Sequence, residues 1–212
     1  DGDTASIGMG QFIHLIRRNV NMTYIVANNG CYGLTKGQDS ATADYGSVAK
    51  GGAVNPFDGI DLASLAILQG ASFVGRSFSG DKEQLEPLIR AAMAHNGFAF
   101  IDVVSPCVTF NNHTGSTKSY SNTREHLEPM ALDFVPMREE IRTQYAEGST
   151  QSVTLHDGSV IHLHKADSGY KTDDRMGALN AIQSGNDADR ILTGLLYLDP
   201  NSKDLNTNLN LA

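Results

Sequence analysis

The 212-residue sequence contains 24 acidic and 16 basic residues, which gives a formal net charge of −8 at pH 7. This acidic balance, without any stripe rich in lysine or arginine, argues against nucleic-acid binding, which depends on neutralising phosphates. No run of about 18 apolar residues is present, so a membrane span is not expected. The two cysteines, Cys31 and Cys107, are too few for a disulfide framework and favour a reducing, cytoplasmic location.

The first half of the sequence predicts alternating helices and strands. Apolar residues at helical spacing alternate with short apolar runs that are typical of buried parallel strands. The expected elements are a helix over 6–18, a strand over 22–27, a helix over 62–69 between Asp61 and Gly70, a strand over 72–75, a helix over 82–95 after Asp81, and a strand over 98–104. Residues 29–59 are rich in glycine and predict a long functional loop, since long loops in compact domains commonly carry function.

This order of strands and helices predicts an α/β fold, in which helices flank both faces of a parallel sheet. Ligands of such sheets bind beyond the carboxyl ends of the strands. Asn28-Asn29 and Cys107 each follow a predicted strand. We therefore expect them on the same rim of the sheet.

The second half of the sequence has a different pattern. Residues 111–122 are polar, and the alternating segments 151–155 and 159–164 flank Asp157-Gly158, a strong hairpin signal. Residues 173–183 predict a helix, and residues 199–212 are polar. We expect two parts: a cofactor-binding α/β domain over 1–110, and a C-terminal extension over 111–212 that contains the hairpin and packs on that domain or on a partner subunit.

Two motifs near the start of the chain predict a metal site. The sequence opens on Asp1-Gly2-Asp3, and Asn28-Asn29 stands at the end of the first predicted strand. The segment between them fits one helix and one strand, so both motifs should meet at one edge of the sheet. A carboxylate and a carboxamide there would give Mg²⁺ two oxygen ligands, with phosphate and water completing its shell. The pattern indicates a diphosphate–metal clamp, although an isolated Asp-Gly-Asp is more often a surface turn.

The motifs resemble a known family. Gly-Asp-Gly followed by Asn-Asn at this spacing is the thiamine diphosphate (ThDP) signature, of which only the first glycine would precede Asp1. The run from Asn28 to Gln38, Asn-Asn-Gly-Cys-Tyr-Gly-Leu-Thr-Lys-Gly-Gln, resembles the β subunit of 2-oxoacid:ferredoxin oxidoreductases. Its Leu-Thr-Lys-Gly-Gln part is most similar to the 2-oxoglutarate type. The resemblance implies a pyrophosphate-domain fold, and we expect the chain to be truncated at both ends.

The resemblance also implies roles for individual residues. The metal ligands would be Asp1, Asn29 and the backbone carbonyl of Cys31. Cofactor contacts would come from Gly2, Asp3, Asn28, Gly30, Tyr32 and Leu34. Cys107 would be the fourth ligand of a [4Fe–4S] cluster, which forms only in the full-length protein because four thiolates are the rule; a lone cysteine of this kind is otherwise a small buried hydrophobe. Lys36 would pair with a substrate carboxylate, or is a solvated loop lysine.

The activity implied is oxidative decarboxylation of a 2-oxoacid, most similar to 2-oxoglutarate, to an acyl-CoA. Electrons would pass through the cluster to ferredoxin, and ThDP with Mg²⁺ would carry the difficult step. An α subunit would be required, because the sequence shows no pyrimidine-binding domain. Two alternatives stay open: another ThDP-dependent decarboxylase or synthase, and a non-catalytic fragment that binds only its partner chain. The sequence alone does not distinguish 2-oxoglutarate from pyruvate.

Overall fold

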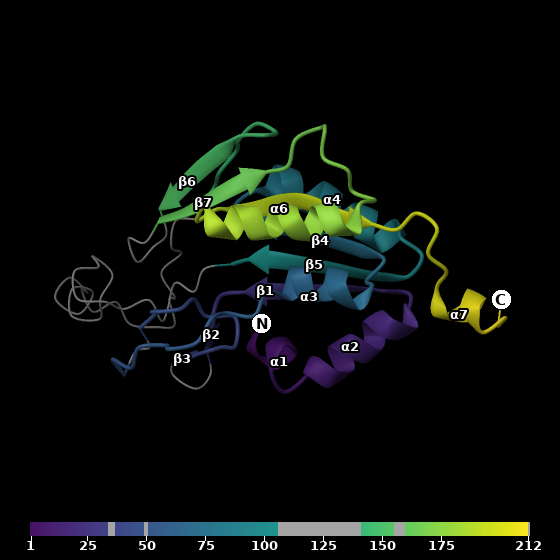
Figure 1. Ribbon diagram of the computed structural model, residues 1–212, viewed down its shortest axis with the longest axis horizontal. Coiled ribbons are helices and arrows are strands. Elements are labelled where there is room, and N and C mark those ends of the chain that lie inside the picture. The colour runs from purple at the N-terminus through teal and green to yellow at the C-terminus, as the bar shows by residue number, and fades with distance from the viewer. Residues whose placement is uncertain (34–36, 49–50, 106–140, 155–159, 212) are drawn as a thin grey trace, which may run out of the picture.

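The computed structural model describes residues 1–33, 37–48, 51–105, 141–154 and 160–211. Its centre is a six-stranded sheet in the order β1-β5-β4-β8-β7-β6 (Figure 1). The strands are β1 (Met22–Asn28), β4 (Phe73–Phe78), β5 (Phe98–Val104), β6 (Thr150–Thr154), β7 (Val160–Lys165) and β8 (Ile191–Leu198). β1, β5 and β4 run parallel, β8 pairs antiparallel with β4, and β7 runs parallel to β8. The sheet is therefore mostly parallel but mixed.

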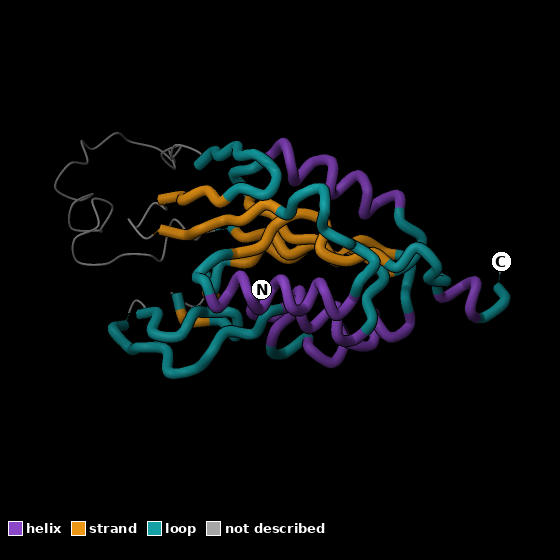
Figure 2. The backbone as a smooth tube through the Cα atoms, turned by 45° about the horizontal axis from the view of Figure 1, so that its top comes forward, coloured by secondary structure: helices purple, strands orange, loops and turns teal. Residues whose placement is uncertain are grey.

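Helices cover both faces of this sheet. One face carries α2 (Met9–Arg18), α3 (Leu62–Gln69) and α6 (Arg175–Asp187), and the other carries α4 (Lys82–Ala94) (Figure 1). Figure 2 shows the strands as one layer with helices on either side. The predicted α/β class is confirmed. We call the two faces the α3 side and the α4 side.

The core has a separate apolar cluster on each side. On the α3 side, the buried ring of Phe12 lies 5.1 Å from that of Phe100, with the ring planes steeply inclined. On the α4 side, Leu88 packs directly on the backbone of β4, where a Cβ on Gly75 would lie 2.8 Å from the Leu88 side chain. Burial of these side chains stabilises the sheet by roughly 1.5–3 kcal/mol for each large apolar group.

Four of the described helices begin at an aspartate whose side chain caps the first turn. The carboxylates of Asp61, Asp81, Asp174 and Asp204 each accept a backbone N–H from the first turn of the helix that follows. Such caps satisfy donors that have no partner inside the helix. The predicted starts of α3 and α4 are thus confirmed, and α3 ends as expected at Gly70, whose φ is 90°.

Two predicted boundaries in the first half are wrong. The helix expected over 6–18 is interrupted: α1 (Gly2–Ala5) comes first, and α2 begins only at Met9. The chain turns at Gly8, whose N–H donates to the Asp3 carbonyl oxygen, and a Cβ on Gly8 would lie 2.8 Å from that oxygen. β4 also continues to Phe78, beyond the four residues expected, because all six of its residues are buried.

The second half contributes three strands to the same sheet. The predicted hairpin is present as β6 and β7, while its Asp157-Gly158 turn lies outside the described residues. α6 continues to Asp187, past the expected end, and the polar tail contains the short helix α7 (Leu205–Asn208). β8 was not predicted as a strand. The polar segment 111–122 and the boundary at 110/111 lie outside the described residues, so the division into two parts stays a prediction.

Candidate functional site

The first and second motifs meet at the carboxyl end of β1. Asp1 Oδ2 accepts three hydrogen bonds: from the Gly30 N–H at 2.9 Å, from the Ser40 hydroxyl at 2.7 Å and from the Thr42 hydroxyl at 2.7 Å. Gly30 follows Asn28-Asn29 directly, and its φ of 71° lets the chain turn there. The carboxylate is thus held against the asparagine pair, as the sequence led us to expect.

The oxygen atoms around this carboxylate suit a hard cation. Asp1 Oδ2 holds the three donors, and within the described ranges no hydrogen bond reaches Oδ1. Asn29 Oδ1 accepts the Cys31 N–H at 3.0 Å, and a carboxamide oxygen has a second lone pair. One carboxylate, one carboxamide and one backbone carbonyl are donors that Mg²⁺ prefers when diphosphate supplies further oxygens. The residues present fit the metal and the diphosphate that the resemblance implies.

Gly2 is needed for a reason that the sequence did not reveal. Its role as a cofactor contact stays a prediction, but in the described structure a side chain occupies the space that a Cβ on Gly2 would take. A Cβ on Gly2 would lie 2.5 Å from the ring of Tyr32. The Tyr32 hydroxyl lies 2.6 Å from that of Ser6, which itself donates to the Gly2 carbonyl oxygen at 2.6 Å. Tyr32 and the first helical turn therefore lock together at the rim.

The long loop that follows is ordered by side-chain contacts rather than by regular structure. Apart from the two-residue strands β2 (Cys31–Tyr32) and β3 (Gln38–Asp39), its described part is irregular. The carboxamide of Asn55 lies within 3.2 Å of the carbonyl oxygens of Ala43, Asp44 and Phe57. These bonds from Asn55 hold the two ends of the loop segment 43–57 together and so keep Thr42 at the rim.

A buried charged network lies directly beneath the rim on the α3 side. Asn28 Nδ2 donates to Asp102 Oδ1 at 3.1 Å, and Asp102 Oδ2 pairs with Arg76 Nε at 2.9 Å. Arg76 in turn reaches Asp61 Oδ1, in the cap of α3, at 2.7 Å. The Asp102 side chain is 1% exposed and that of Arg76 is 6% exposed. Charge pairs thus join β5, β4 and α3. A hydrogen bond between Asp102 and Asn28 connects these pairs to the rim.

The network favours the charged forms of Asp61 and Arg76. Burial alone would raise the pKa of Asp61, but the Arg76 charge and the hydrogen bonds from Ser64 and Asn186 hold that pKa below its usual value. Burial alone would lower the pKa of Arg76, but Asp61 and Asp102 raise it. A buried charge is stable only when paired in this way.

The sequence-predicted site residues divide into three groups. The structure brings together Asp1, Gly2, Asn28, Asn29, Gly30, Cys31 and Tyr32. Asp3 lies exposed in α1, with its carbonyl oxygen accepting the Gly8 N–H. Leu34, Lys36 and Cys107 lie outside the described residues, so their roles stay predictions.

Sequence reasoning missed Ser40, Thr42, Asp102, Arg76 and Asp61 as parts of one network. A signal was present for two of them, because Asp102 and Arg76 are charged residues inside otherwise apolar strands. Charged residues are almost never fully buried unless they are paired. For Ser40 and Thr42 no signal was available, since the loop has no periodicity that tells which hydroxyls face inward.

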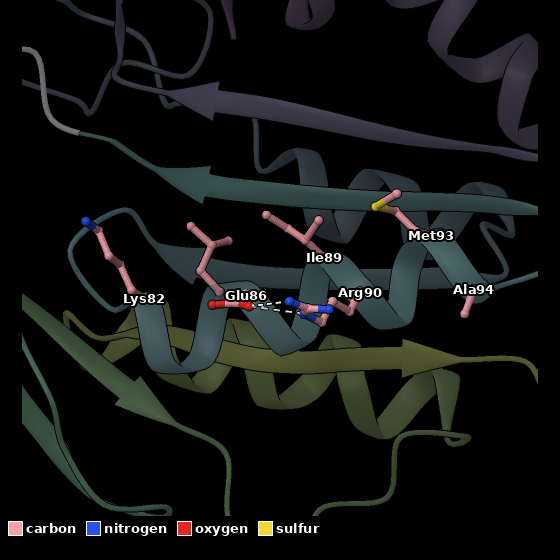
Figure 3. Close-up of a pocket in the computed structure, with 7 residues that line it drawn as sticks. Lys82, Glu86, Ile89, Arg90, Met93 and Ala94 are labelled. Carbon is pink, nitrogen blue, oxygen red and sulfur yellow. Dashed lines mark hydrogen bonds and ion pairs between the residues drawn. The ribbon is translucent and has the colours of Figure 1, made fainter.

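Other features of the described surface do not belong to this rim. A shallow hollow runs along the outer flank of α4, lined by apolar Leu85, Ile89 and Met93, and edged by a Glu86–Arg90 pair (Figure 3). The parts of the chain that the structure describes contain no cluster of three or more His, Cys, Asp or Glu side chains able to hold a metal. Within these same parts, no helix is both long and apolar enough to cross a membrane.

Comparison with known proteins first gives the class. Residues 1–103 match the family model described as the thiamine pyrophosphate enzyme, C-terminal TPP binding domain. This matched segment runs from Asp1 nearly to the end of β5. The matched range contains the rim and the whole charged network beneath it.

The relatives give the particular family. The chain is 44% identical over 167 residues to a 2-oxoacid:ferredoxin oxidoreductase subunit beta of Saccharolobus solfataricus, covering 77% of this chain and 54% of the relative. It is 42% identical over 116 residues to the 2-oxoglutarate oxidoreductase subunit KorB of Mycobacterium tuberculosis, covering 53% of this chain and 30% of the relative. The chain thus spans about half the length, or less, of these relatives. The resemblance to the β subunits of 2-oxoacid:ferredoxin oxidoreductases is thus confirmed.

A solved structure supports the same assignment. The 2-oxoglutarate:ferredoxin oxidoreductase from Magnetococcus marinus, with 2-oxoglutarate, coenzyme A and succinyl-CoA bound, is similar with a TM-score of 0.71. Sequence identity is 27%, and the match covers 100% of this chain and 58% of that chain. The similarity therefore includes the three strands of the second half as well as the TPP-binding domain.

Proposed function

We propose that this chain is the ThDP-binding part of a β subunit that, with an α subunit, oxidatively decarboxylates a 2-oxoacid and passes electrons to ferredoxin. The observation that carries this proposal is the Asp1 carboxylate held against the Asn28-Asn29-Gly30 turn by three donors. In support, the curated relatives are named as subunits of such oxidoreductases. We propose 2-oxoglutarate as the substrate, with coenzyme A as the acyl acceptor, because the solved relative holds both.

The residues of this chain would bind and orient rather than transfer protons. Asp1, Asn29 and the Cys31 carbonyl would hold Mg²⁺, which would anchor the diphosphate. Ser40 and Thr42 fix the Asp1 carboxylate so that one oxygen faces the cation. Bound ThDP supplies an electron sink for loss of CO₂, chemistry that belongs to the cofactor. Fixing the ligands beforehand lowers the entropy lost when the cofactor binds.

Three further parts of the proposal fall on residues outside those described. Lys36 would pair with a carboxylate of the substrate, since a 2-oxo diacid carries two. Cys107 would bind a [4Fe–4S] cluster together with three cysteines from the full-length protein. A cytoplasmic location is proposed from the cysteine usage of the chain.

The test uses the full-length chain, co-purified anaerobically with its α subunit. Reduction of a viologen dye would be followed with ThDP, Mg²⁺ and coenzyme A, comparing 2-oxoglutarate with pyruvate. The proposal expects 2-oxoglutarate-dependent bleaching of an iron–sulfur absorption band, lost in Cys107→Ala. Preference for pyruvate would overturn the substrate. A colourless protein that binds ThDP would favour another decarboxylase or synthase, and failure to bind ThDP would favour a non-catalytic subunit.

A further inference from the structure

We propose that the buried Arg76–Asp102 pair positions the Asn28 carboxamide and, through Thr42, tunes the Asp1 carboxylate for its cation. Asp102 and Arg76 are then positioning residues that act from beneath the rim. This inference rests on the proposed function, because it takes Asp1 as a ligand of Mg²⁺. Three contacts carry it, one for each link of the chain from Arg76 to Asp1.

The first link sets which way the Asn28 amide points. Asn28 Nδ2 lies 3.1 Å from Asp102 Oδ1, and Asn28 Oδ1 lies 2.9 Å from the Thr42 hydroxyl. A carboxylate only accepts hydrogen bonds, so the amide NH₂ must face Asp102 and the amide oxygen must face Thr42. An uncharged group in place of the carboxylate would tolerate the flipped amide as well.

The second link holds the Asp102 side chain in place. Its other oxygen, Oδ2, accepts from Arg76 Nε at 2.9 Å. Arg76 and Asp102 are direct neighbours in the register of β4 and β5, so the sheet itself fixes their separation. The second bond of Arg76, to Asp61 at 2.7 Å, ties the guanidinium to the start of α3. Removal of either charge would leave the other charge unpaired in the protein interior.

The third link transmits the amide orientation to Asp1. The Thr42 hydroxyl lies 2.7 Å from Asp1 Oδ2 and 2.9 Å from Asn28 Oδ1, but it has one proton to donate. With the observed orientation, Asp1 Oδ2 and Asn28 Oδ1 both compete for that proton, and the Ser40 hydroxyl also lies 2.9 Å from the Thr42 hydroxyl. A flipped amide would instead donate to Thr42 and direct the hydroxyl proton to Asp1. The Asp1 carboxylate would then be drawn toward Thr42 and out of the orientation in which Gly30, Ser40 and Thr42 now hold it, so its hold on a cation would weaken.

Asp81 provides a matched control on the α4 side. Like Asp102, it is almost fully buried, with one oxygen on a neutral donor, the Gln84 N–H at 3.2 Å, and the other 3.1 Å from a cation, Lys165. Asp102→Asn and Asp81→Asn are therefore equivalent changes in burial, charge and partner type. Only Asp102 is bonded to Asn28.

The experiment measures Mg²⁺-dependent ThDP binding by calorimetry in the full-length chain co-purified with its α subunit, together with the unfolding midpoint. We expect Asp102→Asn to weaken binding by roughly 10–100-fold, as is typical for residues that orient metal ligands. Asp81→Asn should lower the unfolding midpoint but leave binding within about twofold, because among the described residues no hydrogen bond joins Asp81 to Asn28 or Asp1. Binding by Asp102→Asn that equals wild type, or falls no more than in Asp81→Asn, overturns the inference.

Variants of Thr42 test the inference if Asp102→Asn does not fold. Thr42→Ser keeps the hydroxyl and should bind ThDP and Mg²⁺ like wild type, whereas Thr42→Val should bind more weakly. Equal affinities for Thr42→Ser and Thr42→Val contradict the inference. Wild-type protein that does not bind ThDP at all would overturn the proposed function, and the assignment to Asp102 with it.

Discussion

The two sides of β4 hold buried charges of the same kind with different connections. On the α3 side, Arg76 pairs with Asp102 and Asp61, and the network continues through Asn28 to the rim. On the α4 side, Asp81 pairs with Lys165, whose ammonium also lies 4.6 Å from the ring centre of Tyr145. Burial of charge alone therefore does not mark a functional group. What distinguishes the α3 side is a hydrogen-bonded path to the proposed ligands.

The contacts around Asp81 and Lys165 on the α4 side indicate a structural role. The Tyr145 hydroxyl lies 3.0 Å from that of Thr193 on β8, and the Thr193 hydroxyl lies 3.2 Å from the His164 carbonyl oxygen on β7. Burial raises the pKa of Tyr145, and the charge of Asp81 adds to this, although the bond to Thr193 opposes it. The network thus joins the start of α4 to the strands of the second half, and we expect it to affect stability alone.

The largest expected effect comes from removing the shared cation of the α3 side. Arg76→Met would leave the buried Asp102 and the partly buried Asp61 without their cation, which should lower the free energy of unfolding by about 3–5 kcal/mol. Lys165→Met should have a smaller effect, because the Lys165 side chain is 14% exposed and its removal strands one carboxylate rather than two. Urea unfolding of both variants measures the difference.

The same pair of variants can break the comparison. Arg76→Met should also weaken Mg²⁺-dependent ThDP binding, whereas Lys165→Met should not. An equal loss of ThDP affinity in the two variants would show that the two sides are not separate. An equal loss of stability would show that the second carboxylate of the α3 side carries no additional penalty.

A smaller effect is expected where glycine permits close packing on each side. Gly2→Ala would place a Cβ 2.5 Å from the Tyr32 ring, whose hydroxyl is held by Ser6. Overpacking of this kind costs about 1–3 kcal/mol, and here it should also reduce ThDP binding. Gly75→Ala, which meets Leu88 at 2.8 Å, should destabilise the α4 side without changing ThDP binding.

The double variant Gly2→Ala with Tyr32→Ala checks the cause. If the ring is the obstacle, removing it should recover part of the stability that Gly2→Ala loses, measured by thermal unfolding. A double variant less stable than the sum of its single changes would show that Gly2 is needed for its backbone instead. Normal ThDP binding by Gly2→Ala would show that the packing of Tyr32 on Gly2 does not contribute to the cofactor site.

Contacts of the site could be predicted from the sequence only where a short local motif specifies them. The meeting of Asp1 with Asn28-Asn29 follows from a short helix, a strand and the shared rim of parallel strands, so it could be anticipated. The bonds from Ser40 and Thr42 to Asp1 could not, because no periodicity fixes which loop side chains point inward. The role of Asp102 was visible only as a charge within an apolar strand, and its partner Arg76 lies 26 positions away.

The missed strand β8 shows a different limit. Its sequence is broken by Gly194, with a φ of 119°, and its register with β4 shifts between Val74 and Gly75. Its position between β4 and β7 is decided by long-range pairing, since β4 lies more than a hundred residues earlier. Sequence pattern indicates that an apolar segment is buried but not which strand it joins. Tertiary pairing therefore determines the place of β8 in the sheet, whereas local motifs predict the meeting of Asp1 with Asn28-Asn29.

The smallest expected effect concerns His95, which caps the C-terminal end of α4, whereas Asp81 caps its N-terminal end. Its Nε2 lies 2.7 Å from the buried Ser72 hydroxyl. Burial lowers the pKa of His95 below its ordinary value of 6.5, although Asp199 opposes the shift. The unfolded chain therefore takes up the proton more readily than the folded one, so stability should fall as pH drops below 6.5 toward the folded pKa.

His95→Gln provides the matched variant, because an amide can still bond to Ser72 but does not titrate. Between about pH 7 and pH 5, where an ordinary histidine takes up its proton, wild type should lose more stability than His95→Gln in thermal unfolding. At neutral pH the two should bind ThDP and Mg²⁺ equally, since no hydrogen bond among the described residues joins His95 or its partner Ser72 to Asp1 or Asn28. Identical pH dependence in the two proteins would show that Asp199 cancels the effect of burial. A change in ThDP affinity at neutral pH would instead connect the α4 side to the site and remove the distinction between the two sides of β4.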